Sequence, residues 1–311
     1  MDRKVAIGLD LGGTNIKYGL VDDKGTFLFE GLMPSCGDVS SEAVLNQLLA
    51  AASACSAEAA RLGLLPVGVG VGSPGIVDPT ERIVIGGAEN IVGWQMVPVA
   101  DFLESKLQLP VRVSNDANLM GLGETAFGAA QGCSDVLFLT IGTGIGGAVI
   151  IDGKLFGGYR NRGTELGHIP LVANGEICAC GSVGCWEAYA STAALVRQYK
   201  EKATGTRDQE IDGKMVVSLY LSGDQLATEV MNTHFFYLGR GIAGLINIFS
   251  PQRIVIGGGI SEAGDFYLAN ISELAFKHAM PECSENTEIV VAQLGNKAGC
   301  LGAAQLMLAN S

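Results

Sequence analysis

The chain has 311 residues, of which 48% are apolar and 17% charged, with a formal net charge of −12 at pH 7. The composition is typical of an ordered globular protein, and the length suggests two domains. The negative charge disfavours a nucleic-acid partner, because a polyanion is bound by basic patches. No run of 18 apolar residues is free of both charge and glycine, so we expect no membrane-spanning helix.

The N-terminus and the cysteines indicate a cellular compartment. A short charged start leads directly into a strand, without the apolar segment and cleavage site of a signal peptide. We therefore expect a cytoplasmic protein with reduced thiols. Five of the eight cysteines are most simply read as small packing residues: Cys36, Cys55, Cys133, Cys283 and Cys300.

The first elements form a β-hairpin with a glycine-rich turn. A strand at 4–9 runs into the sequence DLGGTN (10–15), a second strand follows, and a third lies at 26–31. Backbone N–H groups in such a turn can bind an anion, and Asp10 is placed to meet a cation bound to that anion. The pattern matches neither the Gly-Lys-Ser/Thr phosphate loop nor G-x-G-x-x-G. An ordinary hairpin is the alternative.

A helix at 41–62 and a strand at 66–73 come next, followed by Pro74-Gly75. Next come a strand at 83–87, a polar loop at 90–93, a helix at 97–107 and a strand at 111–114. That last strand ends at Asn115-Asp116, and a carboxylate at the C-terminal end of an α/β strand is often a functional residue. Asp116 could act as a general base toward a hydroxyl group. Equally, it could cap the helix that begins near Ala117.

The second half of the chain repeats the first pattern. After a helix at 117–127, a strand at 135–140 leads through the turn GTGIGG (142–147) into a strand at 148–151. The repetition suggests two similar domains facing each other across a cleft. The glycines at 257–259 could let an adenine lie against the backbone, or could form only a tight turn. The other expected elements are helices at 187–202, 224–249, from about 261 and at 299–309, strands at 253–256 and 288–292, and a polar stretch with a short helix at 203–223.

The segment 163–187 contains a candidate metal site. One imidazole and three thiols are spaced as His168, Cys178, Cys180 and Cys185. A Cys₃His set is a ligand set of closed, structural zinc sites, which leave no open position for catalysis. Buried or reactive cysteines are the alternative, but a Cys-x-Cys pair can hardly enter two separate disulfides.

Two carboxylates flank this segment. Glu165 lies three residues before His168, and Glu187 lies two residues after Cys185. Closing the segment on a metal would bring both glutamates into one neighbourhood. Ionised carboxylates accept hydrogen bonds, which suits a ligand with several hydroxyl groups. Solvated surface charges explain the spacing equally well.

Together these motifs resemble the ROK family of sugar kinases (repressors, open reading frames and kinases). The resemblance extends over essentially the whole chain, and the zinc segment with its upstream ELGH is the most specific part. It rests on LDLGGTN (9–15), GSPG (72–75), the stretch 90–94, NDA (115–117), TIGTGIGG (140–147), ELGH (165–168), the C-x-C-G-x-x-G-C-x-E run (178–187) and IGGG (256–259).

The resemblance implies the fold. We expect two actin-like (ribonuclease H-like) α/β domains with mixed sheets flanking a cleft. The small N-terminal domain would cover residues 1–116 and be closed by the C-terminal helix at about 297–311. The large domain would cover residues 117–296 and carry the zinc segment.

The resemblance also implies an ATP-dependent hexokinase of carbohydrate metabolism and glycolysis, with Mg²⁺ on the nucleotide phosphates and a structural Zn²⁺. Glucose is the expected substrate and Asp116 the catalytic base; a homodimer is expected by analogy with the family. The sugar-binding residues would be Gly75, Asn90, Asn115, Asp116, Glu165, His168 and Glu187. The ATP-binding residues would be Asp10, Gly12, Gly13, Thr14, Gly142, Thr143, Gly144, Gly257, Gly258 and Gly259.

Alternatives within the family are an N-acetylmannosamine or N-acetylglucosamine kinase and a fructokinase. From other classes, the alternatives are a non-catalytic sugar-sensing regulator and a transcriptional repressor. Family repressors carry an N-terminal helix-turn-helix, for which a first strand at residue 4 leaves no room.

Overall fold

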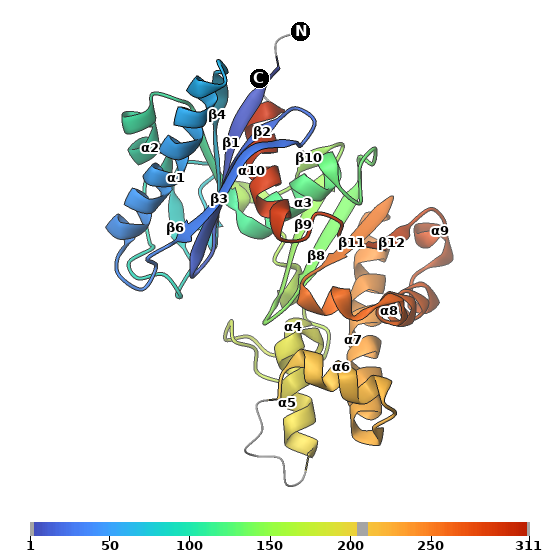
Figure 1. Ribbon diagram of the computed structural model, residues 1–311. Helices are drawn as coiled ribbons and strands as arrows, with labels where there is room; N and C mark the ends of the chain where they lie inside the picture. Colours follow the sequence, from blue (N-terminus) through green and yellow to red (C-terminus); the bar gives the residue numbers. More distant parts are fainter. Residues whose placement is uncertain (1–2, 204–210, 310–311) are drawn as a thin grey trace. The chain divides into compact units, whose positions relative to one another are not determined.

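The computed structural model describes residues 3–203 and 211–309 and has two five-stranded mixed sheets with helices packed on them (Figure 1). The α/β class with two mixed sheets is thereby confirmed. The chain divides into two compact units, one formed by residues 1–134, 148–164 and 293–311 and the other by 135–147 and 165–292. The first unit includes residues 117–134, and the expected domain boundary after residue 116 stays a prediction.

The first sheet has the strand order β3-β2-β1-β4-β7. Its first three strands are antiparallel, and β4 and β7 join β1 in parallel. A parallel step brings the C-terminal ends of neighbouring strands to the same edge, where ligands bind in α/β sheets. The strands are β1 Val5–Leu11, β2 Asn15–Asp22, β3 Phe27–Pro34, β4 Pro66–Ser73 and β7 Val111–Asn115.

The two faces of this sheet are covered differently. Large apolar side chains of β1 and β4 pack on one face in the core that includes helix α1 (Ser41–Arg61) and helix α2 (Val99–Leu107). On the other face lies helix α10 (Ala298–Leu308), as Figure 1 shows. A Cβ added to Gly70 would lie 1.8 Å from the Ala303 carbonyl oxygen. Helix α10 therefore lies directly on the backbone of the sheet.

Helix α3 (Asp116–Phe127) begins where β7 ends and packs against α10. A Cβ on Gly302 would lie 1.8 Å from the Leu119 carbonyl oxygen, so the two helices touch through their backbones. Farther along α3, the fully buried Glu124 accepts hydrogen bonds from the backbone N–H groups of Ala129, Gln293 and Leu294. These bonds fix the chain that leads into α10.

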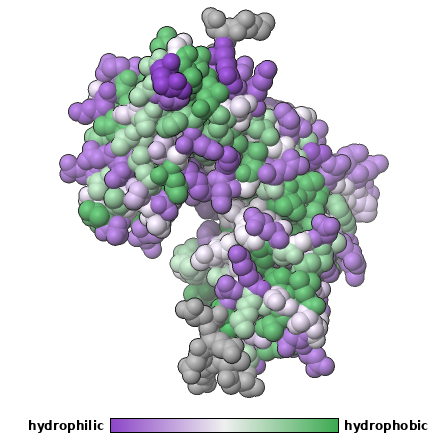
Figure 2. Space-filling model, viewed as in Figure 1, coloured by the Kyte–Doolittle hydropathy of each residue, from purple (hydrophilic) through white to green (hydrophobic). Residues whose placement is uncertain are grey.

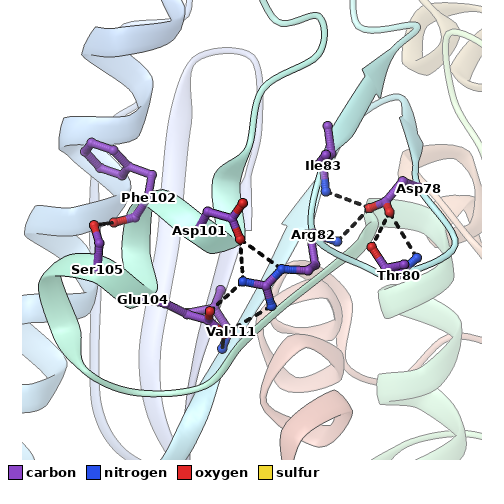
Figure 3. Close-up of polar contacts among 9 residues, drawn as sticks. All are labelled: Asp78, Thr80, Arg82, Ile83, Asp101, Phe102, Glu104, Ser105 and Val111. Carbon is purple, nitrogen blue, oxygen red and sulfur yellow. Dashed lines mark hydrogen bonds and ion pairs between the residues drawn. The ribbon is translucent and has the colours of Figure 1, made fainter.

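A small hairpin of β5 (Ile76–Val77) and β6 (Val84–Gly86) lies between β4 and α2. Figure 3 shows how its loop is held. Asp78 accepts hydrogen bonds from the backbone N–H groups of the loop, and the Arg82 guanidinium pairs with Asp101 and Glu104 of α2. Glu104 also accepts a bond from the Val111 N–H at the start of β7. The cluster ties the hairpin to both α2 and the sheet.

The second sheet has the order β10-β9-β8-β11-β12, with β8, β11 and β12 parallel. The strands are β8 Val136–Ile141, β9 Ile145–Ile151, β10 Lys154–Leu155, β11 Arg253–Gly257 and β12 Glu288–Val291. The expected strand at 148–151 thus begins earlier, at Ile145. The remaining α-helices are α4 Glu187–Ala190, α5 Thr192–Lys202, α6 Gly213–Leu221, α7 Gln225–Phe249, α8 Asp265–His278 and α9 Pro281–Ser284.

The expected single helix at 187–202 is wrong, because the helix is interrupted at Ser191, between α4 and α5. Ser191 is extended, and its Oγ accepts a hydrogen bond from the Ala194 N–H, so it is the N-cap of α5. Serine is a preferred N-cap for this reason. The expected helix from residue 261 starts as the 3₁₀ turn Gly259–Ala263 before α8. The short helix expected within 203–223 is α6, and residues 204–210 of that stretch lie outside the described residues.

No helix among the described residues is long and apolar enough to cross a membrane. On the face drawn in Figure 2, hydrophilic residues are interspersed with apolar areas.

Candidate functional site

Two aspartates lie at the same edge of the first sheet. Asp10 is in β1, where it pairs with Gly72 of β4, and Asn115, the residue before Asp116, pairs with Ser73 of β4. Asp10 is only 7% exposed. The pKa of Asp116 is raised to about 6, mainly by burial and in smaller part by the nearby charge of Asp10. The edge therefore holds two close carboxylates, one with a pKa suited to proton transfer near neutral pH.

The structure distinguishes Asp116 from a helix cap. Asn115 is the N-cap of α3, because its side-chain oxygen accepts from the backbone N–H groups of Ala117 at 3.0 Å and Asn118 at 3.3 Å. Its amide nitrogen donates to the Gly75 carbonyl oxygen at 3.0 Å. Asp116 is the first residue of the helix, and its Oδ1 accepts from the Ala117 N–H at 2.8 Å. Asn115 thus holds Asp116 and Gly75 together.

The glycine turn between β1 and β2 lies beside Asp10. The Gly12 N–H donates to the Asn15 carbonyl oxygen at 2.9 Å, and a Cβ on Gly13 would lie 2.7 Å from the Asn90 side-chain nitrogen. Residues 12–15 are exposed, including Thr14. Lys17, opposite Asp10 in β2, has its ammonium 3.9 Å from Asp10 Oδ2. The structure therefore brings Asp10, the turn and Asn90 together.

In the second unit, the four predicted metal ligands converge. The ligand atoms of His168, Cys178, Cys180 and Cys185 all lie within 4.8 Å of one another. The Cys180 and Cys185 sulfurs are 3.7 Å apart, and the Cys178 sulfur is 3.6 Å from His168 Nδ1. Zn–S bonds of about 2.3 Å and Zn–N bonds of about 2.05 Å give tetrahedron edges of about 3.8 and 3.6 Å. The donor set fits zinc, and these two separations match the edges of a zinc tetrahedron.

The structure places the two flanking glutamates differently. Glu187 Oε2 accepts from the Ile145 N–H at 2.8 Å, and its Oε1 lies 3.9 Å from the Cys178 sulfur. A Cβ on Gly144 would lie 2.3 Å from Glu187 Oε2, so the carboxylate rests on the turn between β8 and β9. Glu165 is exposed, and its carbonyl accepts from the His168 N–H across a single 3₁₀ turn.

The second unit also contains a cavity of about 1060 Å³. Gly142 and Thr143 of the β8–β9 turn and Gly259 lie in its wall, while Ile141, Val196 and Ile260 give the wall an apolar part. Gly258 has a φ of +93°, and a Cβ there would lie 2.2 Å from the Ile141 carbonyl oxygen. Gly257 is the last residue of β11. A cavity of this size and lining is typical of small-molecule sites.

Thr192 is a wall residue that the motifs did not indicate. Its N–H donates to the Gly142 carbonyl oxygen at 2.8 Å, which joins the start of α5 to the turn. Lys17 beside Asp10 was missed in the same way. Neither residue lies in a recognisable motif, and only strand pairing or tertiary contact reveals them.

Comparison with known proteins places this geometry in a family. The model of the ROK family matches residues 6–310. The chain belongs to the ROK family. A glucokinase from Streptomyces coelicolor is 36% identical, with 97% of each chain covered.

Solved structures of ROK proteins share the fold. A ROK glucokinase from Streptomyces griseus, in complex with glucose and AMPPNP, is 35% identical with a TM-score of 0.79, over 97% of this chain and 98% of that one. A ROK hexokinase from Thermus thermophilus is 34% identical with a TM-score of 0.87, over 99% and 100%.

Proposed function

We infer that the protein is an ATP-dependent sugar kinase that transfers the γ-phosphate of ATP to a hydroxyl group of glucose, giving glucose 6-phosphate. The observation that carries the inference is the position of Asp116, a carboxylate with a raised pKa at the ligand-binding edge of a ROK sheet. The glucokinases of two Streptomyces species and the bound glucose and AMPPNP in one of them support the choice of substrates.

We propose that Asp116 is the general base. Phosphoryl transfer depends mainly on positioning and charge neutralisation, and the attacking hydroxyl must lose its proton as it reacts. A pKa of about 6 keeps Asp116 ionised at neutral pH while making it a stronger base than an ordinary aspartate. Its bond from the Ala117 N–H and the cap at Asn115 hold the carboxylate in place.

The residues proposed to bind the sugar are Gly75, Asn90, Asn115 and Asp116 in the first unit and Glu165, His168 and Glu187 in the second. Zinc on His168 Nδ1, the nitrogen that faces Cys178, would leave Nε2 to bond a sugar hydroxyl. Zinc bound by His168, Cys178, Cys180 and Cys185 would have a structural role, because it brings together residues from three turns of the chain.

ATP would lie in the cavity of the second unit, with the base against its apolar wall. In the second unit, the residues proposed to contact phosphate through their backbone are Gly142, Thr143 and Gly144. In the first unit, the residues proposed for ATP binding are Gly12, Gly13 and Thr14. The adenosine would lie near Gly257, Gly258 and Gly259. Mg²⁺ would neutralise charge on the phosphates. Asp10 fits it as a ligand, directly or through water, because its carboxylate is buried at the sheet edge and the Lys17 ammonium, 3.9 Å away, is beyond hydrogen-bond distance.

A panel of sugars tests the assignment. Mg-ATP and zinc-loaded protein are incubated with glucose, mannose, fructose, N-acetylglucosamine and N-acetylmannosamine, and ADP release is followed. Preference for glucose supports the proposal. Preference for an N-acetylated sugar or fructose would keep the mechanism and replace the substrate, and no turnover on any sugar would favour a non-catalytic sugar sensor.

We further propose that the kinase works in the cytoplasm, within glycolysis, as a homodimer that binds neither nucleic acid nor membrane. The net charge of −12 and the unpaired thiols of the eight cysteines support this setting. Sedimentation of the purified protein tests the dimer, which a monomeric mass at micromolar concentration would exclude.

A further inference from the structure

Gly299, in the first turn of α10, lies against the carboxylate of Asp10. A Cβ added to Gly299 would lie 2.7 Å from Asp10 Cγ, 2.7 Å from Oδ2 and 2.8 Å from Oδ1. Nearly the whole carboxyl group therefore occupies the space that a side chain at residue 299 would need. The other glycine of α10, Gly302, differs: the three atoms nearest to a Cβ there would all belong to the backbone of α3.

The face of the sheet around Asp10 explains why a side chain at residue 299 would meet this carboxylate. Alternate residues of β1 and β4 on the α10 side have small side chains or none, as at Ala6, Gly8 and Gly70. A Cβ on Gly8 would lie 2.1 Å from the Cys300 carbonyl oxygen, so α10 is held close to the strand. Cys300 Sγ also lies 3.2 Å from the Gly8 carbonyl oxygen. Asp10 continues this row at the C-terminal end of β1, and the helix above it cannot retreat without losing these contacts.

We propose that Gly299 is a positioning residue for phosphoryl transfer: by lacking a side chain it lets α10 form one wall of the Asp10 site and fixes where the carboxylate lies. The inference rests on the proposed function, in which Asp10 serves the metal on the ATP phosphates. A displacement of about 1 Å at such a group can reduce a rate by about 10²-fold.

The geometry separates this role from a merely structural one. With alanine at 299, the atoms in conflict belong to the end of a side chain, so the carboxylate can move while the backbone stays. Alanine is also the better helix former, by about 1 kcal/mol in a helix interior. With alanine at 302, the conflict at 1.8 Å is with the Leu119 carbonyl oxygen, and the helix pair itself must separate.

The experiment compares wild type with Gly299→Ala, Gly302→Ala and Gly244→Ala in thermal unfolding and in glucose-dependent ADP formation at varied Mg²⁺. Gly244, on α7, has open space around its Cβ position and is the control. We expect Gly299→Ala to unfold within about 3 °C of wild type, to lose at least about tenfold in kcat, to need more Mg²⁺ and to keep its KM for glucose. Gly302→Ala should lose stability, and Gly244→Ala should resemble wild type.

A double-mutant cycle with Asp10→Asn decides whether the effect passes through Asp10. If it does, adding Gly299→Ala to Asp10→Asn costs little further activity, because the two effects are not additive. Wild-type kinetics in Gly299→Ala, or a full additive loss in the double variant, would overturn the inference. Absence of turnover by wild type and Gly244→Ala alike would instead reject the proposed kinase function.

Discussion

The raised pKa of Asp116 predicts an acid limit to catalysis. If Asp116 must be ionised to act, kcat/KM follows the ionised fraction of this carboxyl group in the free enzyme. With a pKa of about 6, roughly one-tenth of the enzyme is ionised at pH 5. A carboxyl at the ordinary value of 3.8 would be more than about nine-tenths ionised at that pH. The structure therefore predicts that kcat/KM for glucose falls about tenfold between pH 7.5 and pH 5.

The assay is a timed reaction at saturating Mg-ATP in which ADP is separated by chromatography, because coupling enzymes would themselves respond to pH. Circular dichroism at each pH corrects for unfolded protein. Asp116→Asn is the matched variant: it keeps the size of the side chain, removes the base and should lose at least about 10²-fold in kcat at every pH. A constant kcat/KM from pH 7.5 to 5 in folded wild-type enzyme, or an Asp116→Asn variant as fast as wild type, would show that Asp116 is not the general base.

Three further predictions concern the scaffold. Metal analysis should find one zinc per chain, and Cys180→Ser should reduce zinc content, melting temperature and glucose affinity together; zinc-free wild-type protein with full stability would contradict the site. The imidazole of His234 is fully buried, which lowers its pKa from 6.5 to about 3, so the histidine stabilises the fold above pH 6.5 and this contribution is lost as the pH falls toward 3. By linkage, the contribution lost at pH 5 is about 2 kcal/mol of the free energy of unfolding. In urea unfolding, the free energy of His234→Phe should therefore fall by about 2 kcal/mol less than that of wild type between neutral pH and pH 5. An equal fall in both proteins would be the contrary result. Arg82→Ala should free the hairpin next to Gly75 and raise the glucose KM several-fold with a smaller change in kcat, whereas Lys24→Ala, at an exposed turn, should leave the KM unchanged.

The motifs predicted those parts of the site that are local in the chain. The ligands of the zinc segment lie within 18 residues of one another, and the turns that join them contain glycine, so spacing alone indicated the cluster. Likewise, Asp10 lies near the end of β1 and Asp116 follows β7, two strands whose apolar residues are evident, and parallel pairing through β4 brings the strand ends together. Such features depend on short-range chain geometry, which a sequence displays directly.

Other features depend on contacts between distant segments. The break at Ser191 was missed because helix-forming residues lie on both sides, and the serine was not recognised as an N-cap. The roles of Asn115 and Asp116 could not be separated, because either side chain can cap a helix; only the bonds of Asn115 to Asn118 and Gly75 decide it. The contact between Gly299 and Asp10 joins opposite ends of the chain and has no local signal.

We infer that this chain phosphorylates glucose with ATP. The most direct measurement is the initial rate of ADP formation by zinc-loaded protein with Mg-ATP, with and without glucose, in wild type and Asp116→Asn. We expect glucose-dependent ADP formation and a phosphorylated sugar in wild type, both lost in the variant. ADP formation that does not depend on any sugar, or none at all in the folded, zinc-loaded wild type, would contradict it.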